Sequence, residues 1–194
     1  PWFLEFKQLI GLPQNPIYHP EGDVWNHTML VLDVAASYRQ QCENPYYFMM
    51  AALCHDLGKI ETTQYIKGAY HAYGHEDKGL KIAENFIKRI TNEKQLRRYV
   101  LNMIELHMKP DVLYRNQSKV KTTNKMFDDS IAPQELIYLS ICDNMGKEQK
   151  ESEAAKFLQA RLKHYETIMN QDHVKGNDLI QAGLKPDATF HELL

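Results

Sequence analysis

The sequence contains only three cysteines among its 194 residues, no long hydrophobic run and no strong excess of charge of either sign. Cys42, Cys54 and Cys142 lack the CxxC spacing of structural metal sites, and an odd, scattered set argues for reduced thiols rather than a disulfide framework. No apolar stretch approaches the ~18 residues that a membrane span needs. The formal net charge of −2 argues against a protein that coats duplex DNA or an anionic membrane. We therefore expect a globular, cytoplasmic protein without a membrane partner.

The residues that are present are typical of a helical domain. Hydrophobic residues make up 43% and charged residues 25% of the chain, as in an average soluble domain. Hydrophobic periodicity and capping residues indicate where the helices lie. We expect helices from about Asp23 to Gln40, Pro45 to Gly58, His75 to Ile90, Glu93 to Met108, Pro133 to Gly146 and Lys150 to Asn170. This pattern predicts an all-α helical bundle.

Local signals set the helix boundaries and the connections. Asp23 is a candidate N-cap, Gly58 a C-terminal stop for the second helix, and Pro110 a stop for the fourth. The segment TTQYIKGAYHAYGH predicts an ordered loop or a short hairpin around Lys67–Gly68. The Lys-rich stretch YRNQSKVKTTNK predicts a loop with a short helix behind it. The last residues predict two short helices joined by a Gly-Pro turn.

Ionisable side chains occupy the apolar faces of several of these helices. His27 shares a face with valines, and His55 and Asp56 follow the apolar run of the second helix. His107 and Asp143 lie on the apolar faces of the fourth and fifth helices. A single inward histidine is commonly a hydrogen-bonded core residue, but the same feature on four helices suggests one common cause. A bound divalent cation would neutralise the carboxylates and accept the imidazole lone pairs.

The remaining histidines divide by position. His75, at the start of the third helix, is a further ligand candidate. The others lie in loops, on polar faces or in the tail, and we interpret them as surface residues: His19, His71, His164, His173 and His191. Nitrogen and carboxylate ligands without thiolates disfavour a structural zinc site. We therefore expect a catalytic centre for one or two divalent ions of Mn, Fe, Co, Ni, Zn or Mg.

The order His27, His55–Asp56, Asp143 resembles the H…HD…D signature of the HD superfamily of metal-dependent phosphohydrolases. The setting AALCHDLGK is similar to that family well beyond the dipeptide. The resemblance implies that these residues hold a first metal. His75 and His107 resemble the additional histidines of members that hold two metals, in which the aspartate of the pair bridges the ions.

A closer resemblance covers nearly the whole chain. The stretches GLPQNPIYHPEGDVWNHTMLVLD, YGHEDKG, ELHMKP and GNDLIQAGLKP are similar to the C-terminal HD region of bacterial tRNA nucleotidyltransferases, the CCA-adding enzymes. Asp187 stands where that family usually has Gly, and the motif of its nucleotidyltransferase head does not occur in these 194 residues. The resemblance implies a metal-dependent 2′,3′-cyclic phosphodiesterase, 2′-nucleotidase or phosphatase. We expect an HD-type domain over residues 1–170 and a helical tail, 171–194, packed on it.

These observations lead us to expect hydrolysis of a phosphate ester of a nucleotide, a cyclic nucleotide or an RNA end. Asp56, Lys59 and His107 are the candidate catalytic residues. Lys59 could contact a phosphate oxygen or only complement a helix end, and His107 could act as an acid or base if one metal binds. Three basic residues of the Lys-rich stretch could contact the phosphate or form a solvated face: Arg115, Lys119 and Lys121.

Two alternatives stay open. A non-catalytic HD module could bind a nucleotide or RNA without turnover, although such a module has no need for so many inward polar groups. A structural bundle could instead bury the same residues in ion pairs. That arrangement requires a cation beside Asp56 and another beside Asp143, and the helical patterns predict no inward Lys or Arg there.

Overall fold

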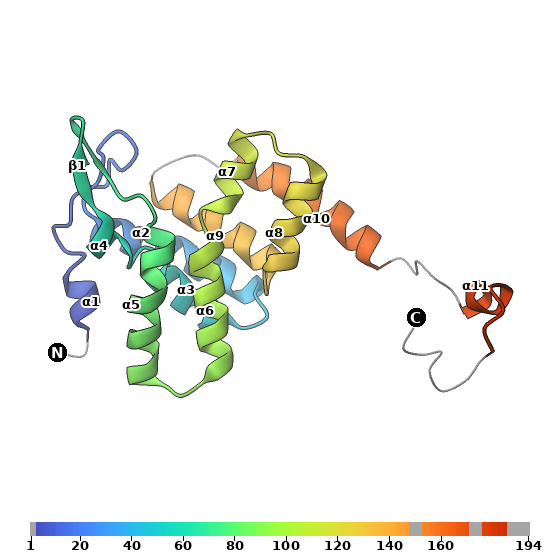
Figure 1. Ribbon diagram of the computed structural model, residues 1–194. Helices are drawn as coiled ribbons and strands as arrows, with labels where there is room; N and C mark the ends of the chain where they lie inside the picture. Colours follow the sequence, from blue (N-terminus) through green and yellow to red (C-terminus); the bar gives the residue numbers. More distant parts are fainter. Residues whose placement is uncertain (1–2, 148–152, 171–175, 186–194) are drawn as a thin grey trace. The chain divides into compact units, whose positions relative to one another are not determined.

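The computed structural model of the protein describes residues 3–147, 153–170 and 176–185 (Figure 1). Its elements in chain order are α1 (Leu4–Lys7), α2 (Val24–Tyr38), the 3-10 helix η1 (Arg39–Gln41), α3 (Pro45–Cys54), α4 (Lys59–Thr62), β1 (Gln64–Ile66), β2 (Ala69–His71), α5 (His75–Ile90), α6 (Lys94–Leu106), α7 (Lys109–Arg115), α8 (Val120–Asp129), α9 (Pro133–Gly146), α10 (Glu153–Met169) and α11 (Gly176–Gln181). One two-stranded sheet accompanies these helices, so the all-α class is confirmed. Within the described ranges, no helix is both long enough and apolar enough to cross a membrane.

The chain divides into two compact units, residues 1–162 and 163–194. The first unit contains the helical bundle, and the described part of the second contains the end of α10 and the short helix α11. The expected domain boundary at residue 170 and the packing of the tail stay predictions. Several sequence predictions fall outside the described residues: the helix start at Lys150, the histidines His173 and His191, the substitution at Asp187 and the second tail helix.

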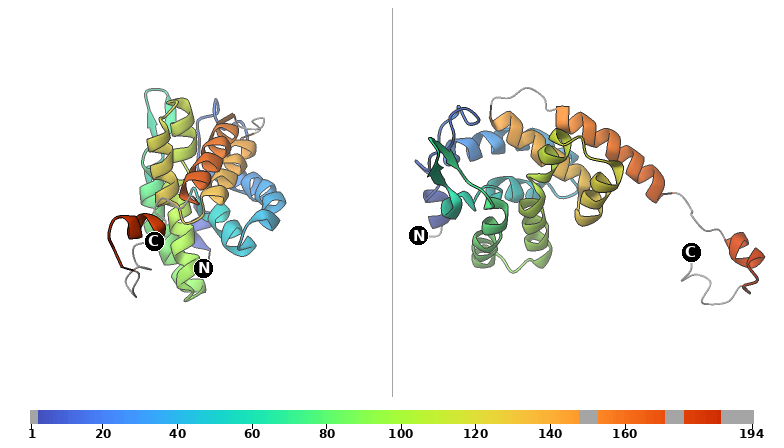
Figure 2. Two further views of the ribbon diagram at one scale, coloured as in Figure 1. Left: turned by 90° about the vertical axis from the view of Figure 1, so that its right-hand side faces the viewer. Right: turned by 45° about the horizontal axis from the view of Figure 1, so that its top comes forward.

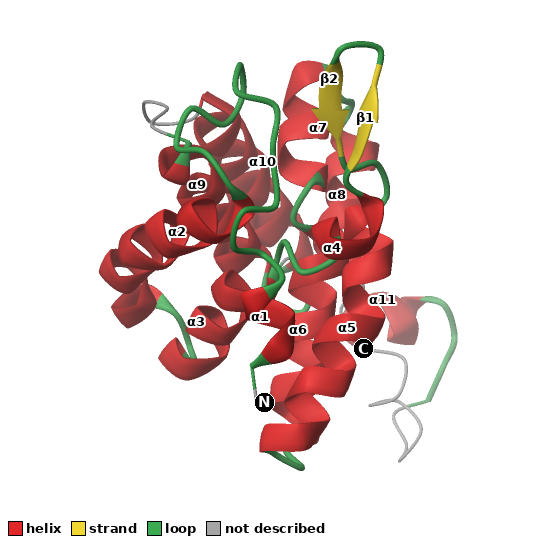
Figure 3. Cartoon of the chain, turned by 90° about the vertical axis from the view of Figure 1, so that its left-hand side faces the viewer, coloured by secondary structure: helices red, strands yellow, loops and turns green. Residues whose placement is uncertain are grey.

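Helix α3 lies between α2 and α6 in the first unit. It packs against α2, α6 and α9, while α2 also packs along α9 and α5 along α6 (Figures 2 and 3). Phe48, Ala51 and Ala52 of α3 are completely buried. A helix that neighbours surround is apolar on several faces, and each large side chain it buries contributes about 1.5–3 kcal/mol. The C-terminal end of α3, which leads into His55–Asp56, is therefore held rigidly in the core.

Gly58 marks a close approach between two backbones. The prediction that it stops the second helix is wrong, because α3 already ends at Cys54 and Gly58 has a φ of −66, in the ordinary right-handed region. A Cβ atom at Gly58 would lie 1.8 Å from the carbonyl oxygen of His75 and 2.5 Å from the nitrogen of Gly79. Only glycine lets the turn after α3 pack directly on the first turns of α5. This contact brings His75 next to Asp56.

The segment between α4 and α5 forms the short hairpin that the sequence offered as one alternative. Strands β1 and β2 pair antiparallel around a two-residue loop, Lys67–Gly68. Both loop residues have a positive φ, 50° for Lys67 and 88° for Gly68. Turns of this kind match the right-handed twist of the two strands that they connect. The predicted N-cap is also confirmed, since the Asp23 carboxylate accepts a hydrogen bond from the backbone nitrogen of Asn26 at 2.8 Å.

The Lys-rich region is more helical than its composition suggests. Helix α6 ends at Leu106, before Pro110 is reached. Pro110 occupies the first turn of the next helix, α7. Proline is tolerated there because the first helical N–H groups have no intrahelical acceptor. The predicted loop with a short helix behind it is present, but the loop covers only residues 116–119, because Arg115 ends α7 and Lys121 lies within α8.

Candidate metal centre

Imidazole and carboxylate groups from separate helices meet inside the first unit. His27 belongs to α2, His55 and Asp56 follow α3, His75 begins α5, His107 follows α6 and Asp143 belongs to α9. All of these side chains are buried. Burying such groups without partners costs several kcal/mol each. The structure thus brings together every residue that the sequence indicated as a candidate ligand.

Three of the histidines are oriented in the same way. Nδ1 of His55, His75 and His107 each donates to the backbone carbonyl oxygen three residues earlier, at 2.6–2.8 Å. A neutral imidazole carries only one N–H. These hydrogen bonds therefore leave Nε2 of each ring as a lone pair directed toward the other rings. Such bonds from the second ring nitrogen are the usual way of orienting metal-binding histidines.

The first cluster contains Asp56, His75 and His107. Nε2 of His75 lies 3.1 Å from Nε2 of His107 and 3.4 Å from Oδ1 of Asp56. One ligand atom of each residue lies within 4.8 Å of the other two. Burial, together with the neighbouring His75 and His55, lowers the pKa of His107 to about 3. The His107 ring is therefore neutral at pH 7, and its lone pair is available to a cation.

The second cluster contains His27, His55 and Asp143, again with ligand atoms within 4.8 Å of one another. Oδ1 of Asp143 lies 2.9 Å from Nε2 of His27 and 3.9 Å from Nε2 of His55. Nε2 of His55 is buried and has no hydrogen-bond partner among the described residues. An unpartnered buried nitrogen among carboxylates fits a divalent ion, which would accept the lone pair and offset the negative charge.

Asp56 lies between the two clusters. Its Oδ1 faces His75, whereas its Oδ2 lies 3.3 Å from Nε2 of His55 and 3.6 Å from Nε2 of His27. Each carboxylate oxygen therefore faces a different cluster. This is the arrangement that a carboxylate shared between two ions requires.

Two largely buried lysines accompany the aspartates. Nζ of Lys59 lies 2.8 Å from Oδ2 of Asp56, and Nζ of Lys147 lies 2.6 Å from Oδ2 of Asp143. The expectation that no inward Lys would lie beside these carboxylates is therefore wrong. Burial alone would raise the pKa of Asp56 and of Asp143, but the ammonium groups and the imidazoles outweigh it and hold both pKa values well below their usual range. Lys147 follows Asp143 by four residues, a helical spacing that the sequence could have indicated.

The loop before α2 adds residues that the sequence interpretation missed. Oε1 of Glu21 lies 2.8 Å from Nδ1 of His27 and 2.8 Å from Nδ1 of His19. The surface interpretation of His19 is wrong, because its side chain is only 14% exposed and its ring is nearly perpendicular to the His27 ring at a centroid distance of 5.1 Å. His71 is half-buried, whereas His164 is exposed as expected. A signal for Glu21 existed, since the segment YHPEGD leads directly into the helix of His27.

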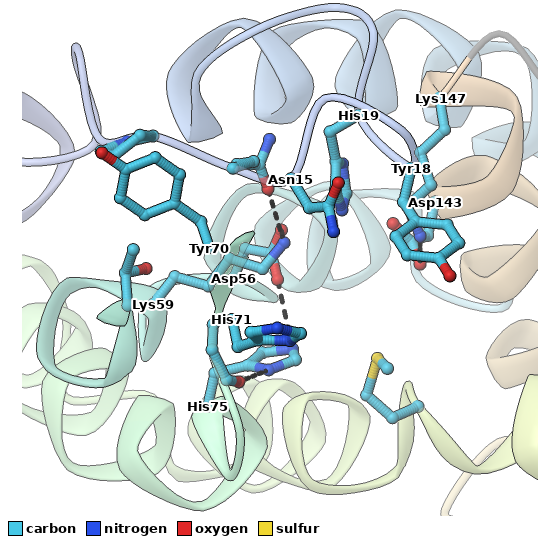
Figure 4. A pocket seen from close by; sticks show the side chains of 15 residues that line it. Asn15, Tyr18, His19, Asp56, Lys59, Tyr70, His71, His75, Asp143 and Lys147 are labelled. Carbon is cyan, nitrogen blue, oxygen red and sulfur yellow. Dashed lines mark hydrogen bonds and ion pairs between the residues drawn. The ribbon is translucent and has the colours of Figure 1, made fainter. Parts of the chain in front are cut away.

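A cavity of ≈ 180 Å³ opens beside the clusters (Figure 4). Its polar lining includes Asp56, Lys59, His75, Asp143 and Lys147. His107 does not line this cavity, so its position suits a ligand better than an acid or base that contacts substrate. Three basic residues for which phosphate contact was one of two alternatives do not line it either, and all three are exposed: Arg115, Lys119 and Lys121.

A helical bundle in which facing helices supply buried imidazole and carboxylate groups is the architecture of a metal-binding helical domain. Residues 24–148 match the HD domain family, and the chain belongs to this family. The H…HD…D resemblance noted in the sequence is thereby confirmed. HD domains bind divalent metals, and the two clusters could hold them.

The chain is also similar to bacterial proteins named Multifunctional CCA protein. It is 33% identical over 195 residues to the one of Actinobacillus pleuropneumoniae serotype 5b (strain L20), covering 98% of this chain and 46% of that protein. With the Mannheimia succiniciproducens protein it shares 31% identity over 198 residues, with the same coverage. A shorter match, 41% over 90 residues, covers 45% of this chain and 21% of the Haemophilus influenzae (strain PittGG) protein. The chain spans about half the length of the relatives it matches throughout, and it corresponds to their HD region.

Proposed function

We propose that the chain is a metal-dependent phosphohydrolase acting on a phosphomonoester or phosphodiester of a nucleotide, a cyclic nucleotide or an RNA end. The observation that supports this proposal is the pair of ligand clusters beside a single cavity. Nitrogen and oxygen ligands without thiolates are typical of catalytic rather than structural metal centres. The similarity to multifunctional CCA proteins supports an RNA-end phosphate as one candidate substrate.

The proposed roles follow from the contacts. His27, His55 and Asp143 hold one divalent ion, and His75 and His107 hold a second, with Asp56 shared between them. Ions in such sites supply Lewis acidity and offset charge on phosphoryl oxygens. Lys59, whose ammonium lies on Asp56 and lines the cavity, binds a phosphate oxygen or stabilises the leaving group. His107, away from the cavity, acts as a ligand.

One observation favours a second candidate function. The ion pairs of Lys59 with Asp56 and of Lys147 with Asp143 neutralise both carboxylates without a metal. A non-catalytic module that binds a nucleotide or RNA in the same cavity would keep these pairs and show no turnover. Turnover separates the two candidates, and metal content tests the ligand assignment, because the buried Nε2 of His55 has no hydrogen-bond partner among the described residues.

The test compares Asp56→Ala with Asp33→Ala, the same change at an exposed position of α2. Wild type purified without chelator should contain divalent metal. With Mn, Fe, Co, Ni, Zn or Mg it should hydrolyse esters from a panel of phosphomonoesters, cyclic nucleotides and nucleoside triphosphates. Asp56→Ala should lose both metal and activity while keeping its helical circular dichroism, and Asp33→Ala should keep all three properties.

Wild-type metal content in Asp56→Ala would contradict the ligand assignment. A wild-type protein that binds no metal and hydrolyses nothing in the panel would favour the binding module.

A further inference from the structure

We infer that Gln14 is a positioning residue for Lys59, and that the Lys59 ammonium competes with a divalent ion for Oδ2 of Asp56. The side-chain oxygen of Gln14 keeps this ammonium at the cavity when an ion binds the carboxylate. Gln14 is not one of the residues that the sequence indicated, and its role rests on the metal binding of the proposed function.

The ammonium of Lys59 lies between two oxygens. Its Nζ lies 2.8 Å from Oε1 of Gln14 and 2.8 Å from Oδ2 of Asp56. The contact with Gln14 is a hydrogen bond, whereas Oδ2 of Asp56 is buried without a hydrogen-bond partner among the described residues. Because an ammonium only donates, it is the oxygen of the Gln14 amide that faces it. Lys59 thus donates to Gln14, while its charge lies beside Asp56.

The oxygen of Asp56 that contacts Lys59 is the one that faces the second cluster. Oδ2 lies 3.3 Å from Nε2 of His55 and 3.6 Å from Nε2 of His27. A divalent ion held by this oxygen and the ring nitrogens would repel an ammonium that stayed 2.8 Å from the same oxygen. Lys59 therefore has to leave Asp56 when an ion binds there, and the flexible stem of a lysine permits this movement.

Lys147 differs from Lys59 in this respect. It donates a hydrogen bond to Oδ2 of Asp143 at 2.6 Å, whereas the oxygen of Asp143 that faces His27 is Oδ1. Lys147 and an ion would thus use different oxygens of the same carboxylate. Of the two lysines, Lys59 is the one whose ammonium contacts the oxygen directed at the ring nitrogens.

The loop that carries Gln14 is held in place without Lys59. The backbone nitrogen of Val24, at the start of α2, donates to the carbonyl oxygen of Leu12 at 3.1 Å. Pro13, directly before Gln14, restricts the backbone further because its ring fixes φ. An acceptor on such an anchored loop keeps its position when the ammonium moves.

The other end of the Gln14 amide argues against a role in stability alone. Its Nε2 is buried and has no hydrogen-bond partner among the described residues. A buried donor without an acceptor costs free energy, so the amide contributes through its oxygen. Gln14 and Lys59 both line the cavity, with Asp56 beside them (Figure 4). An ammonium that leaves Asp56 but stays on Gln14 therefore remains at the cavity, where it can contact a phosphate oxygen.

The experiment measures the affinity for Mn²⁺ and for Zn²⁺ by competition with a metal-binding dye, without substrate. Lys59→Met should bind the ions about ten-fold more tightly than wild type, because it removes a cation that competes for Asp56. Lys121→Met, the same change at an exposed lysine of α8, should leave the affinity unchanged. Lys59→Gln replaces the methionine variant if circular dichroism shows that the latter does not fold.

Gln14→Met keeps the length of the side chain but removes the acceptor. It should weaken metal binding by about three- to ten-fold, because the ammonium then relies on Asp56 alone. In a Lys59→Met background the same change should have no effect, since no ammonium is left to hold. A purely structural role of Gln14 would give the same loss in both backgrounds. Gln8→Met, at an exposed glutamine, is the control.

Equal losses in the two backgrounds, or no loss, would overturn the positioning role of Gln14. Unchanged or weaker metal binding by Lys59→Met would overturn the competition for Asp56. If wild type binds metal but hydrolyses no ester, the proposed function fails, and the affinities still decide the roles of Gln14 and Lys59. If none of these proteins binds an ion, both roles fail together with the ligand assignment.

Discussion

Nε2 of His75 lies 3.1 Å from Nε2 of His107, and Nδ1 of each ring donates to a backbone carbonyl, so the neutral form of each ring presents a lone pair at Nε2. Two facing lone pairs repel one another unless a cation lies between them. A bound ion would therefore relieve a repulsion within this pair. Its geometry leads to predictions about the metal content of the protein and about its thermal stability.

Divalent metal should raise the midpoint of thermal unfolding, because the ion binds only the folded chain. At a free concentration one hundred times Kd, the gain is about 2.7 kcal/mol. His107→Ala should bind about one equivalent of metal less, as measured by elemental analysis. It should also lose part of this gain in stability, as measured by calorimetry. His164→Ala, at an exposed position of α10, is the control. An unchanged metal content in His107→Ala would remove this residue from the ligand set.

Glu21 should act as a positioning residue for His27. Its carboxylate lies 2.8 Å from Nδ1 of His27, so it favours the tautomer with the proton on Nδ1. In that tautomer Nε2, which faces Asp143, carries a lone pair. Loss of such an outer partner typically weakens metal binding by about 10- to 100-fold. We expect this loss for Glu21→Ala in a competition titration with a metal-binding dye, and no change for Glu61→Ala, an exposed glutamate of α4.

A nitrogen NMR spectrum of the metal-free protein tests the cause of that effect. Glu21→Ala should shift the tautomer of His27, and Glu21→Gln, which can still accept a hydrogen bond, should preserve more of the metal affinity. Weaker metal binding without any change in the His27 resonances would argue against the positioning role.

Gly58→Ala should destabilise the protein by about 3 kcal/mol or more, because the new methyl group would overlap backbone atoms of α5 that cannot move aside. Gly11→Ala is the matched control. At Gly11 the φ is +73 and no atom lies within 4 Å of an added Cβ, so only backbone strain of about 1–2 kcal/mol is expected. Chemical denaturation measures both losses. Similar losses in the two variants would contradict the close approach at Gly58.

Local sequence patterns predicted the helices that supply the candidate ligands. The third expected helix, His75–Ile90, agrees with α5 at both ends, and the inward position of His27 follows from its spacing to buried neighbours on α2. The reason is that a helix repeats every 3.6 residues, so a periodic pattern in the sequence identifies the buried face without knowledge of the partner helices. His27 and Asp143 were therefore visible as anomalies on such faces.

Tertiary contacts decided the rest. Gly58 looked like a helix stop, but its role comes from α5, a neighbour that no local pattern reveals. Glu21 and His19 lie in a loop whose path has no period, so only the folded chain shows that they reach His27. The sequence alone determined that His27, His55, Asp56, His107 and Asp143 lie on or next to the apolar faces of helices. Only the packing of separate helices determined that their lone pairs and carboxylate oxygens face one another, because distances between segments depend on contacts remote in the chain.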